Sequence, residues 1–171
     1  MKIKRELLLP CVLAALLWIT GCGASNFNST LPQTFAIRQG QTIEFVPIEN
    51  VTGNVLDPPA DQIFNEYMVS LLREKKLLNV GSAPAAQVLK SKLIEYEPGN
   101  AFKRWLLPGY GTTVCAVHAE LFDKATTALI GKIESRQTVS VGGGYSIGAD
   151  TYICKRVADD LVGEIEKKVA K

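Results

Sequence analysis

An alternation of apolar and polar residues with a period of two constrains the fold of this chain more than any other feature. In residues 112–122 one face carries small and apolar side chains: Cys115, Val117, Ala119 and Leu121. Residues 129–141 repeat the pattern, with Ile133, Ser135, Gln137 and Val139 on one face and Lys132, Glu134 and Arg136 on the other. A two-residue period indicates a strand with one buried face. The short link 123–128 predicts that the two strands form a hairpin.

Two further segments have the period of an amphipathic helix. The first begins at Asp57-Pro58-Pro59-Ala60-Asp61, where proline and acidic residues suit a first turn. Its apolar stripe consists of Ile63, Phe64, Tyr67, Met68, Leu71 and Leu72. The second covers about residues 150–169, with Ile153, Cys154, Val157, Leu161, Ile165 and Val169 on one face. Each stripe predicts a helix that packs one side against the rest of the domain.

Two more strands complete the predicted sheet. Residues 43–48, Ile-Glu-Phe-Val-Pro-Ile, predict a strand, but Pro47 confines this strand to an edge or an end. Residues 87–97 alternate less regularly. Together these elements predict an α+β fold in residues 42–171: a two-layer sandwich of a mostly antiparallel sheet of four or five strands and two amphipathic helices.

The N-terminus has the pattern of an export signal. Residues 1–5 are basic, and residues 7–19 form an apolar run that is too short for a membrane span. The run ends in Ile19-Thr20-Gly21-Cys22, which resembles the lipobox of bacterial lipoproteins. The resemblance implies that residues 1–21 are a lipoprotein signal peptide, removed by cleavage. It also implies that Cys22 carries diacylglycerol and an N-acyl chain such as palmitate. An ordinary signal peptide with Cys22 as a bystander is the alternative.

Residues 22–41 follow as the expected lipidated N-terminus and flexible tether, because they are small, polar and almost uncharged. Gly23 stands where inner-membrane retention would favour Asp in many such lipoproteins. We therefore expect a protein on the periplasmic face of the outer membrane, anchored to the bilayer but not spanning it.

The charge balance and the scarcity of catalytic residues exclude several classes of function. The whole chain has 19 basic and 17 acidic residues; without residues 1–21, which hold three basic residues and one acidic residue, both counts are 16. Such a balance argues against nucleic-acid binding. His118 is the single histidine, and the cysteines are distant, so no metal site or cofactor is expected. No nucleophile motif or carboxylate pair appears, and the sequence predicts no enzyme.

The segment 95–113, "EYEPGNAFKRWLLPGYGTT", stands out as a loop between two strands. Prolines and glycines bracket an aromatic and basic cluster: Phe102, Lys103, Arg104, Trp105 and Tyr110. Trp and Arg are enriched in interface hot spots, so we interpret this cluster as a partner-binding surface centred on Arg104 and Trp105. The alternative is that Trp105 and Leu106 cap the core while Lys103 and Arg104 stay in solvent.

Two cysteines, Cys115 and Cys154, remain in the folded domain, both on inward faces of their predicted elements. An exported protein meets an oxidising compartment, where a disulfide between them could form. Two buried free thiols are the alternative.

The loop and the strand after it resemble an uncharacterised bacterial lipoprotein family with a C-terminal domain of unknown function. The residues that carry the resemblance are 97–105, Pro108-Gly109-Tyr110-Gly111 and the strand end Glu120-Leu121-Phe122-Asp123. In that family a basic Gly-x-Gly loop precedes a strand that ends in Asp and a turn containing Thr, here Thr126. The family usually has Thr-Gly where this chain has Thr127 and Ala128. The layout is also distantly similar to small α/β modules of envelope lipoproteins, including the curli-secretion lipoprotein. The resemblance implies a periplasmic lipoprotein of the outer membrane and no reaction.

Three hypotheses for the function follow. The first is a non-enzymatic, lipid-anchored accessory module that binds another envelope protein. The second is a carrier or chaperone that holds an apolar ligand between sheet and helices. The third is an oligomeric component of a secretion pore.

Overall fold

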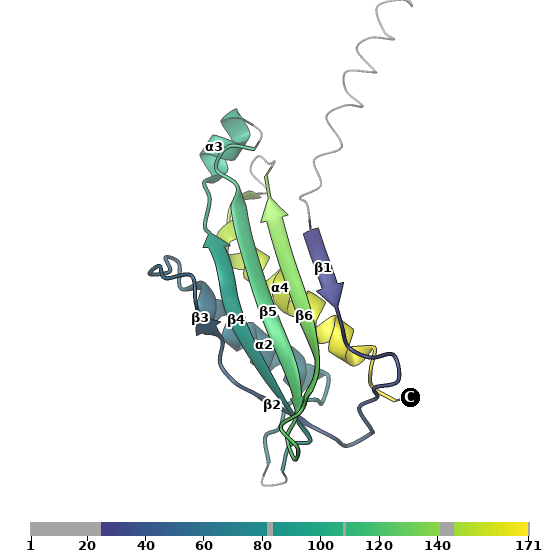
Figure 1. Ribbon diagram of the computed structural model, residues 1–171. Helices are drawn as coiled ribbons and strands as arrows, with labels where there is room; N and C mark the ends of the chain where they lie inside the picture. Colours follow the sequence, from purple (N-terminus) through teal and green to yellow (C-terminus); the bar gives the residue numbers. More distant parts are fainter. Residues whose placement is uncertain (1–24, 82–83, 108, 141–145, 171) are drawn as a thin grey trace, which may run out of the picture.

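The fold is an open six-stranded sheet with helices on one of its faces, and it confirms the predicted α+β sandwich (Figure 1). The computed structural model describes residues 25–81, 84–107, 109–140 and 146–170. The signal peptide and Cys22 lie outside the described residues. The strand order is β1-β6-β5-β4-β2, and the short β3 also pairs with β4.

The predicted hairpin forms the centre of the sheet. Strand β5 (Thr113–Asp123) pairs antiparallel with β6 (Leu129–Val139) and, on its other side, with β4 (Gln87–Glu97). The faces of β5 and β6 that point into the core are those that the alternation predicted. Every residue assigned to the inward face of β5 is buried: Cys115, Val117, Ala119 and Leu121.

The edge beside β4 is parallel, which the sequence did not predict. Strand β2 (Ile43–Phe45) and the two-residue β3 (Glu49–Asn50) both pair parallel with β4, on either side of Pro47. Helix α2 (Ala60–Glu74) connects this edge to β4. Pro47 lacks an N–H for a ladder hydrogen bond, so the interruption at an outer strand agrees with its predicted effect.

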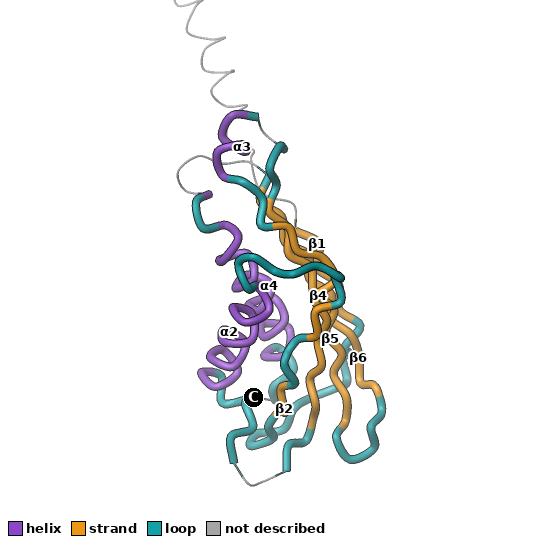
Figure 2. The backbone as a smooth tube through the Cα atoms, turned by 90° about the vertical axis from the view of Figure 1, so that its left-hand side faces the viewer, coloured by secondary structure: helices purple, strands orange, loops and turns teal. Residues whose placement is uncertain are grey.

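The two long helices cover the same face of the sheet (Figure 2). Helix α4 (Ala149–Glu166) packs beside α2, and the core lies between this helical layer and the strands. Fully buried side chains fill that space, among them Phe64, Met68, Leu89, Leu121 and Leu161. The opposite face of the sheet has no helix of the described chain upon it. We call it the outer face.

The N-terminal segment differs from the expected flexible tether. Residues Ser25–Ser29 form strand β1, which pairs antiparallel with β6. Further along, Leu31 packs over Gly131, and Ile37 is fully buried. An uncovered edge of a sheet offers unpaired backbone groups. The uncharged segment satisfies those groups along β6, so the folded domain begins at least as early as Ser25, and not at Thr42.

The segment between β4 and β5 differs as well. Residues Ala101–Leu106, predicted as loop, form the short helix α3, which projects from one end of the sheet (Figure 1). Its six residues are far from the length of a bilayer crossing. None of the described helices is long and apolar enough to span a membrane.

Candidate functional site

The most exposed apolar surface of the domain lies at the end of the sheet where β4 ends and β5 begins. We call residues 98–107 and 109–112, which comprise α3 and the turns on either side of it, the tip. Five large apolar side chains of the tip are each more than half exposed: Phe102, Trp105, Leu106, Leu107 and Tyr110. Contiguous exposed apolar patches of this kind mark protein or membrane contacts.

Local hydrogen bonds explain why the tip is helical. Asn100 is the N-cap of α3, and its side-chain oxygen accepts a hydrogen bond from Lys103 N at 3.0 Å. Asn is among the preferred residues at this position. The returning chain closes the turn, because Asn100 N donates to Gly111 O and Gly109 N donates to Ser140 O, each at 2.8 Å. The tip is therefore attached to both β4 and the end of β6.

Arg104 is the internal support of the tip. Its side chain is only 2% exposed. Its Nη1 donates to Gly111 O at 2.7 Å and to Thr113 Oγ1 at 2.6 Å, and its Nη2 donates to Ser146 O at 2.9 Å. The planar guanidinium can reach these separate segments at once, which a lysine ammonium could not. Arg104 thus joins α3, the start of β5 and the approach to α4.

Two glycines make room for this arrangement. Gly99 has φ of +68°, and a Cβ built there would lie 2.5 Å from Thr113 Oγ1 and 2.6 Å from Arg104 Nη1. Gly111 has φ of +74°, and its Cβ would lie 2.7 Å from Lys103 Cβ. Positive φ and close approach both favour glycine. Of the Gly109-Tyr110-Gly111 pattern, Gly111 therefore has a steric role, whereas a Cβ at Gly109 would meet nothing within 4 Å.

The structure corrects the predicted position of Arg104 in the partner-binding cluster. Arg104 was expected at the surface and is instead buried, because its guanidinium donates hydrogen bonds to Gly111 O, Thr113 Oγ1 and Ser146 O inside the base of the tip. Phe102, Lys103, Trp105 and Tyr110 are exposed, as expected. The alternative prediction was wrong for Trp105 and Leu106, which are 64% and 61% exposed and cap no core, and for Arg104. It was right for Lys103, which is exposed.

The exposed residues of the tip contact one another. The rings of Phe102 and Trp105 have centroids 5.9 Å apart, and Lys103 Nζ lies 5.4 Å from the centroid of the Tyr110 ring. These contacts make the aromatic and basic side chains one surface. That surface is available to a partner.

Strand β1 begins near the tip. Ser25 pairs with Gln137, two residues before the end of β6 at Val139, and Gln137 pairs with Cys115 near the start of β5. Because β1 is antiparallel to β6, its first residue, Ser25, lies at the tip end of the sheet, and β1 runs from there toward the other end (Figure 1). The sequence predicted neither β1 nor its direction.

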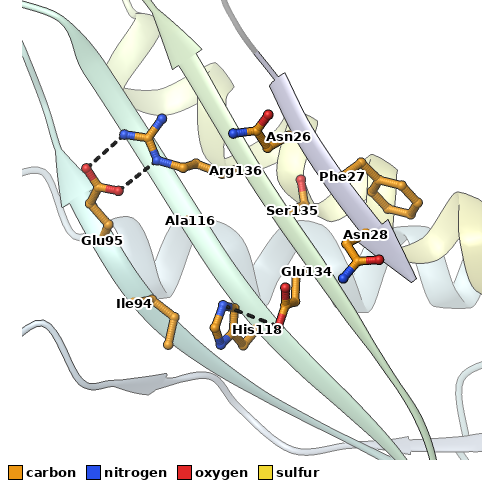
Figure 3. Close-up of a pocket in the computed structure, with 10 residues that line it drawn as sticks. All are labelled: Asn26, Phe27, Asn28, Ile94, Glu95, Ala116, His118, Glu134, Ser135 and Arg136. Carbon is orange, nitrogen blue, oxygen red and sulfur yellow. Dashed lines mark hydrogen bonds and ion pairs between the residues drawn. The ribbon is translucent and has the colours of Figure 1, made fainter. Parts of the chain in front are cut away.

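The outer face of the sheet holds a second candidate surface, a groove of about 350 Å³ (Figure 3). It crosses from β4 to β1, and its floor is Ala116 of β5. Side chains around it include Ile94, Glu95, His118, Glu134, Arg136 and Asn28. Sequence analysis assigned Glu134 and Arg136 to the outward face of their strand but did not identify the groove, which depends on the register between strands.

Ion pairs span the outer face. From β6, Arg136 reaches across Ala116 to Glu95 on β4, with Nε–Oε2 and Nη2–Oε1 distances of 2.9 and 3.1 Å (Figure 3). The hydrogen bonds and the charge of Glu95 raise the pKa of Arg136. His118 Nε2 lies 3.7 Å from Glu134 Oε1, its cross-strand neighbour. A small residue at position 116 lets the long Arg136 side chain lie flat over the sheet.

Both cysteines of the folded domain lie in its core, and a bridge between them stays a prediction. Cys115 and Cys154 are both buried free thiols in the structure, so the predicted disulfide is not formed in it. They are neighbours, since a hydrogen bond with Cys154, together with burial, raises the pKa of Cys115 well above its usual range. Within the described ranges, no cluster of three or more His, Cys, Asp or Glu could hold a metal ion.

Comparison with known proteins agrees with this picture of the fold. The model of a family described as "Domain of unknown function (DUF4410)" matches residues 58–143, half of the chain. No curated protein matches. The PelC dodecamer from Paraburkholderia phytofirmans has a TM-score of 0.54 and 21% identity, over 80% of this chain and 97% of that one.

Two further solved structures have similar folds. The hypothetical protein CT253 from Chlamydia trachomatis has a TM-score of 0.53 and 12% identity, over 75% of this chain and 97% of that one. Protein XCC0632 from Xanthomonas campestris has a TM-score of 0.52 and 11% identity, over 80% of this chain and 90% of that one. The expected kinship with an uncharacterised family is confirmed at the level of the family, and the structures share the fold.

Proposed function

We propose that this chain, which belongs to the DUF4410 family, is a lipid-anchored protein of the outer membrane that binds another envelope protein as a non-enzymatic accessory subunit. The lipobox at Cys22 supports the anchor, and the export signal supports a periplasmic position. Several acyl chains on one cysteine provide the two or more signals that stable anchoring requires.

The observation that carries the binding role is the uncovered outer face of the sheet. Three strands of eleven residues, β4, β5 and β6, present one side to α2 and α4 and leave the other open (Figure 2). The groove over Ala116 shares this face with a second hollow, which is lined by residues that include Lys90, His118 and Glu120. Its mixture of an exposed Ile94 with paired charges matches the composition of non-obligate protein interfaces.

Site-specific photo-crosslinking tests this proposal. A photoreactive residue in place of Ile94, at the groove, should capture one envelope protein in stoichiometric amount. The matched control is the same residue in place of Val55, which is 97% exposed and belongs to the segment between β3 and α2. Equal capture at both positions, or none at Ile94, would contradict the proposed surface.

The anchor itself has a separate test. Mass spectrometry of the N-terminal peptide should show an acylated Cys22 as the first residue. The Cys22→Ala variant should accumulate as an unprocessed precursor. Normal cleavage and membrane retention of that variant would contradict the lipoprotein assignment.

A second candidate function is a subunit of an oligomeric secretion pore. The observation that favours it is the similarity in fold to PelC, which was solved as a dodecamer. Ring particles or a defined multiple of the protomer mass in detergent would support this candidate, and a monomer in detergent would contradict it. The carrier hypothesis has less support, because buried side chains fill the space between the sheet and the described helices.

A further inference from the structure

Exposed apolar residues are concentrated at one end of this domain. Six of the twelve large apolar side chains that are exposed among the described residues belong there. Five are the tip residues. The sixth is Ile147, which is 73% exposed and follows Ser146, the residue whose carbonyl accepts a hydrogen bond from Arg104. Exposed apolar side chains that are concentrated in one place indicate a surface that contacts a protein or a membrane.

The segments that meet at this end are free of acidic residues. The described residues 98–107, 109–112 and 146–149 include no Asp or Glu, although Glu97 and Asp150 flank them, and Ser25–Ser29 carry no charge. Lys103 is the exposed cation of the tip. Acidic side chains and anionic lipid headgroups repel each other, whereas a lysine beside apolar residues can extend toward the headgroups.

The described chain begins at the same end. Ser25 lies opposite Gln137, and β1 runs from the tip end toward the far end of the sheet, so the described residue nearest Cys22 in the sequence is at the tip end. Cys22 is three residues earlier, and an extended chain spans at most about 3.6 Å per residue. The acylated cysteine is therefore within about 11 Å of Ser25. A tether this short holds the tip end of the domain against the bilayer.

We propose that the tip is seated in the interfacial layer of the membrane that holds the acyl chains of Cys22. The inference rests on the proposed lipid anchor. Trp and Tyr are the residues most enriched at the membrane–water interface, and here Trp105 and Tyr110 stand beside Phe102 and Lys103. The occupant of the tip is thus lipid, and the outer face remains available to a protein.

A rigid tip would fix how the domain stands on the membrane. The hydrogen bonds of Arg104 hold α3 to β5 and to Ser146, so contact at α3 orients the whole sheet and not only a mobile loop. Because the long axes of the strands extend from the tip (Figure 1), the groove over Ala116, which lies three residues along β5 from Thr113, would stand off the bilayer surface on the side of the sheet. The lipid chains supply attachment, and the tip supplies orientation.

Tryptophan fluorescence can report directly on whether the tip enters the membrane. Trp18 belongs to the signal peptide, so Trp105 is the single tryptophan of the processed chain. The acylated protein is reconstituted into vesicles of phosphatidylethanolamine and phosphatidylglycerol. Trp105 emission should shift to shorter wavelength, and lipids brominated on the acyl chain close to the headgroup should quench it.

A relocated tryptophan is the matched control. In the double variant Trp105→Phe with Phe122→Trp, the fluorophore stands near the opposite end of β5, and brominated lipids should leave it unquenched. In the Lys103→Glu variant, which adds a negative charge at the exposed surface, most of the quenching of Trp105 should be lost on vesicles that contain phosphatidylglycerol.

Three outcomes of these measurements would contradict either the lipid contact of the tip or the anchor. Acylated protein that floats with vesicles while Trp105 keeps a water-like, unquenched emission would overturn the inference and leave the anchor intact. A blue-shifted Trp105 that brominated lipids do not quench would mean that a protein surface covers the tip, which also overturns it. Absence of acylation at Cys22 would instead contradict the proposed function.

Discussion

Arg104 Nη1 donates a hydrogen bond to Thr113 Oγ1 at 2.6 Å, and this contact ties helix α3 to the first residue of β5. Thr113 Oγ1 in turn donates to Pro98 O at 2.9 Å, on the chain that leaves β4. The two bonds close the base of the tip from both sides. A charged residue that the sequence placed at a binding surface is thus part of the interior support of that surface.

Removal of the Arg104 side chain should destabilise the domain. Arg104→Ala removes three hydrogen bonds that the guanidinium donates, to Gly111 O, Thr113 Oγ1 and Ser146 O, and a hydrogen bond to a charged group contributes about 1.5–3 kcal/mol. We expect the free energy of unfolding to fall by about 2–4 kcal/mol. Arg104→Lys should also be destabilised, because a single ammonium cannot serve the same acceptors.

Lys103→Ala is the matched control for this measurement. Lys103 is the adjacent cation on α3 but is exposed, and surface substitutions usually change stability by less than about 0.5 kcal/mol. Urea unfolding followed by circular dichroism measures all three variants. Equal stability of Arg104→Ala and Lys103→Ala would contradict the buried role of Arg104.

Gly99→Ala should be more harmful than Gly109→Ala. Both glycines have positive φ, +68° and +86°, so the backbone strain of an alanine is similar. A Cβ at Gly99 would meet Thr113 and Arg104 at 2.6 Å or less, whereas a Cβ at Gly109 meets nothing within 4 Å. We expect the melting temperature to fall clearly further for Gly99→Ala, and similar melting temperatures would show that the base of the tip can open without cost.

The two thiols should react slowly in the folded, reduced protein. The thiolate is the reactive form, and the hydrogen bond with Cys154 and burial raise the pKa of Cys115, so little thiolate is present near neutral pH. Labelling with a maleimide should be slow in buffer and complete in denaturant. Rapid labelling in buffer would place the thiols at an accessible surface.

The predicted Cys115–Cys154 disulfide has its own measurement. Protein isolated from the envelope is unfolded without reductant and its free thiols are counted. A bridge between Cys115 and Cys154 closes a loop of about 39 residues, and in the chain-entropy model it would stabilise the fold by about 3–4 kcal/mol. Absence of reactive thiols is the expected result for an oxidised pair, and two thiols per processed chain would rule the bridge out.

Asp123 should make stability depend on acid pH. Hydrogen bonds from Thr126, whose N and Oγ1 each lie 2.8 Å from Asp123 Oδ1, lower the pKa of this carboxyl group in the folded state. A lowered pKa contributes stability that is present above the unfolded value of about 3.9 and is lost as pH falls through the folded value. The melting temperatures of wild type and Asp123→Asn should therefore converge as the pH falls below about 4. A constant difference would contradict the role of the charge.

The central hairpin and the helix faces were predictable because their signals are local. The alternation in 112–122 and 129–141 identified the buried sides of β5 and β6, and the stripe through Phe64, Met68 and Leu72 identified the buried side of α2. Burial of one face imposes such a period on neighbouring residues whatever the rest of the chain does.

The parts that sequence analysis missed depend on contacts between distant segments. Ser25–Ser29 has no alternation of its own and becomes β1 because the edge of β6 is open to it. Arg104 resembles a surface cation until Gly111 O, Thr113 and Ser146 O surround it. Residues alone determined that the tip is aromatic and basic and that the chain has a lipobox. Only the tertiary structure decided that Trp105 faces outward and Arg104 inward, and that the tip and the start of β1 share one end, because those positions follow from pairing and burial across the fold.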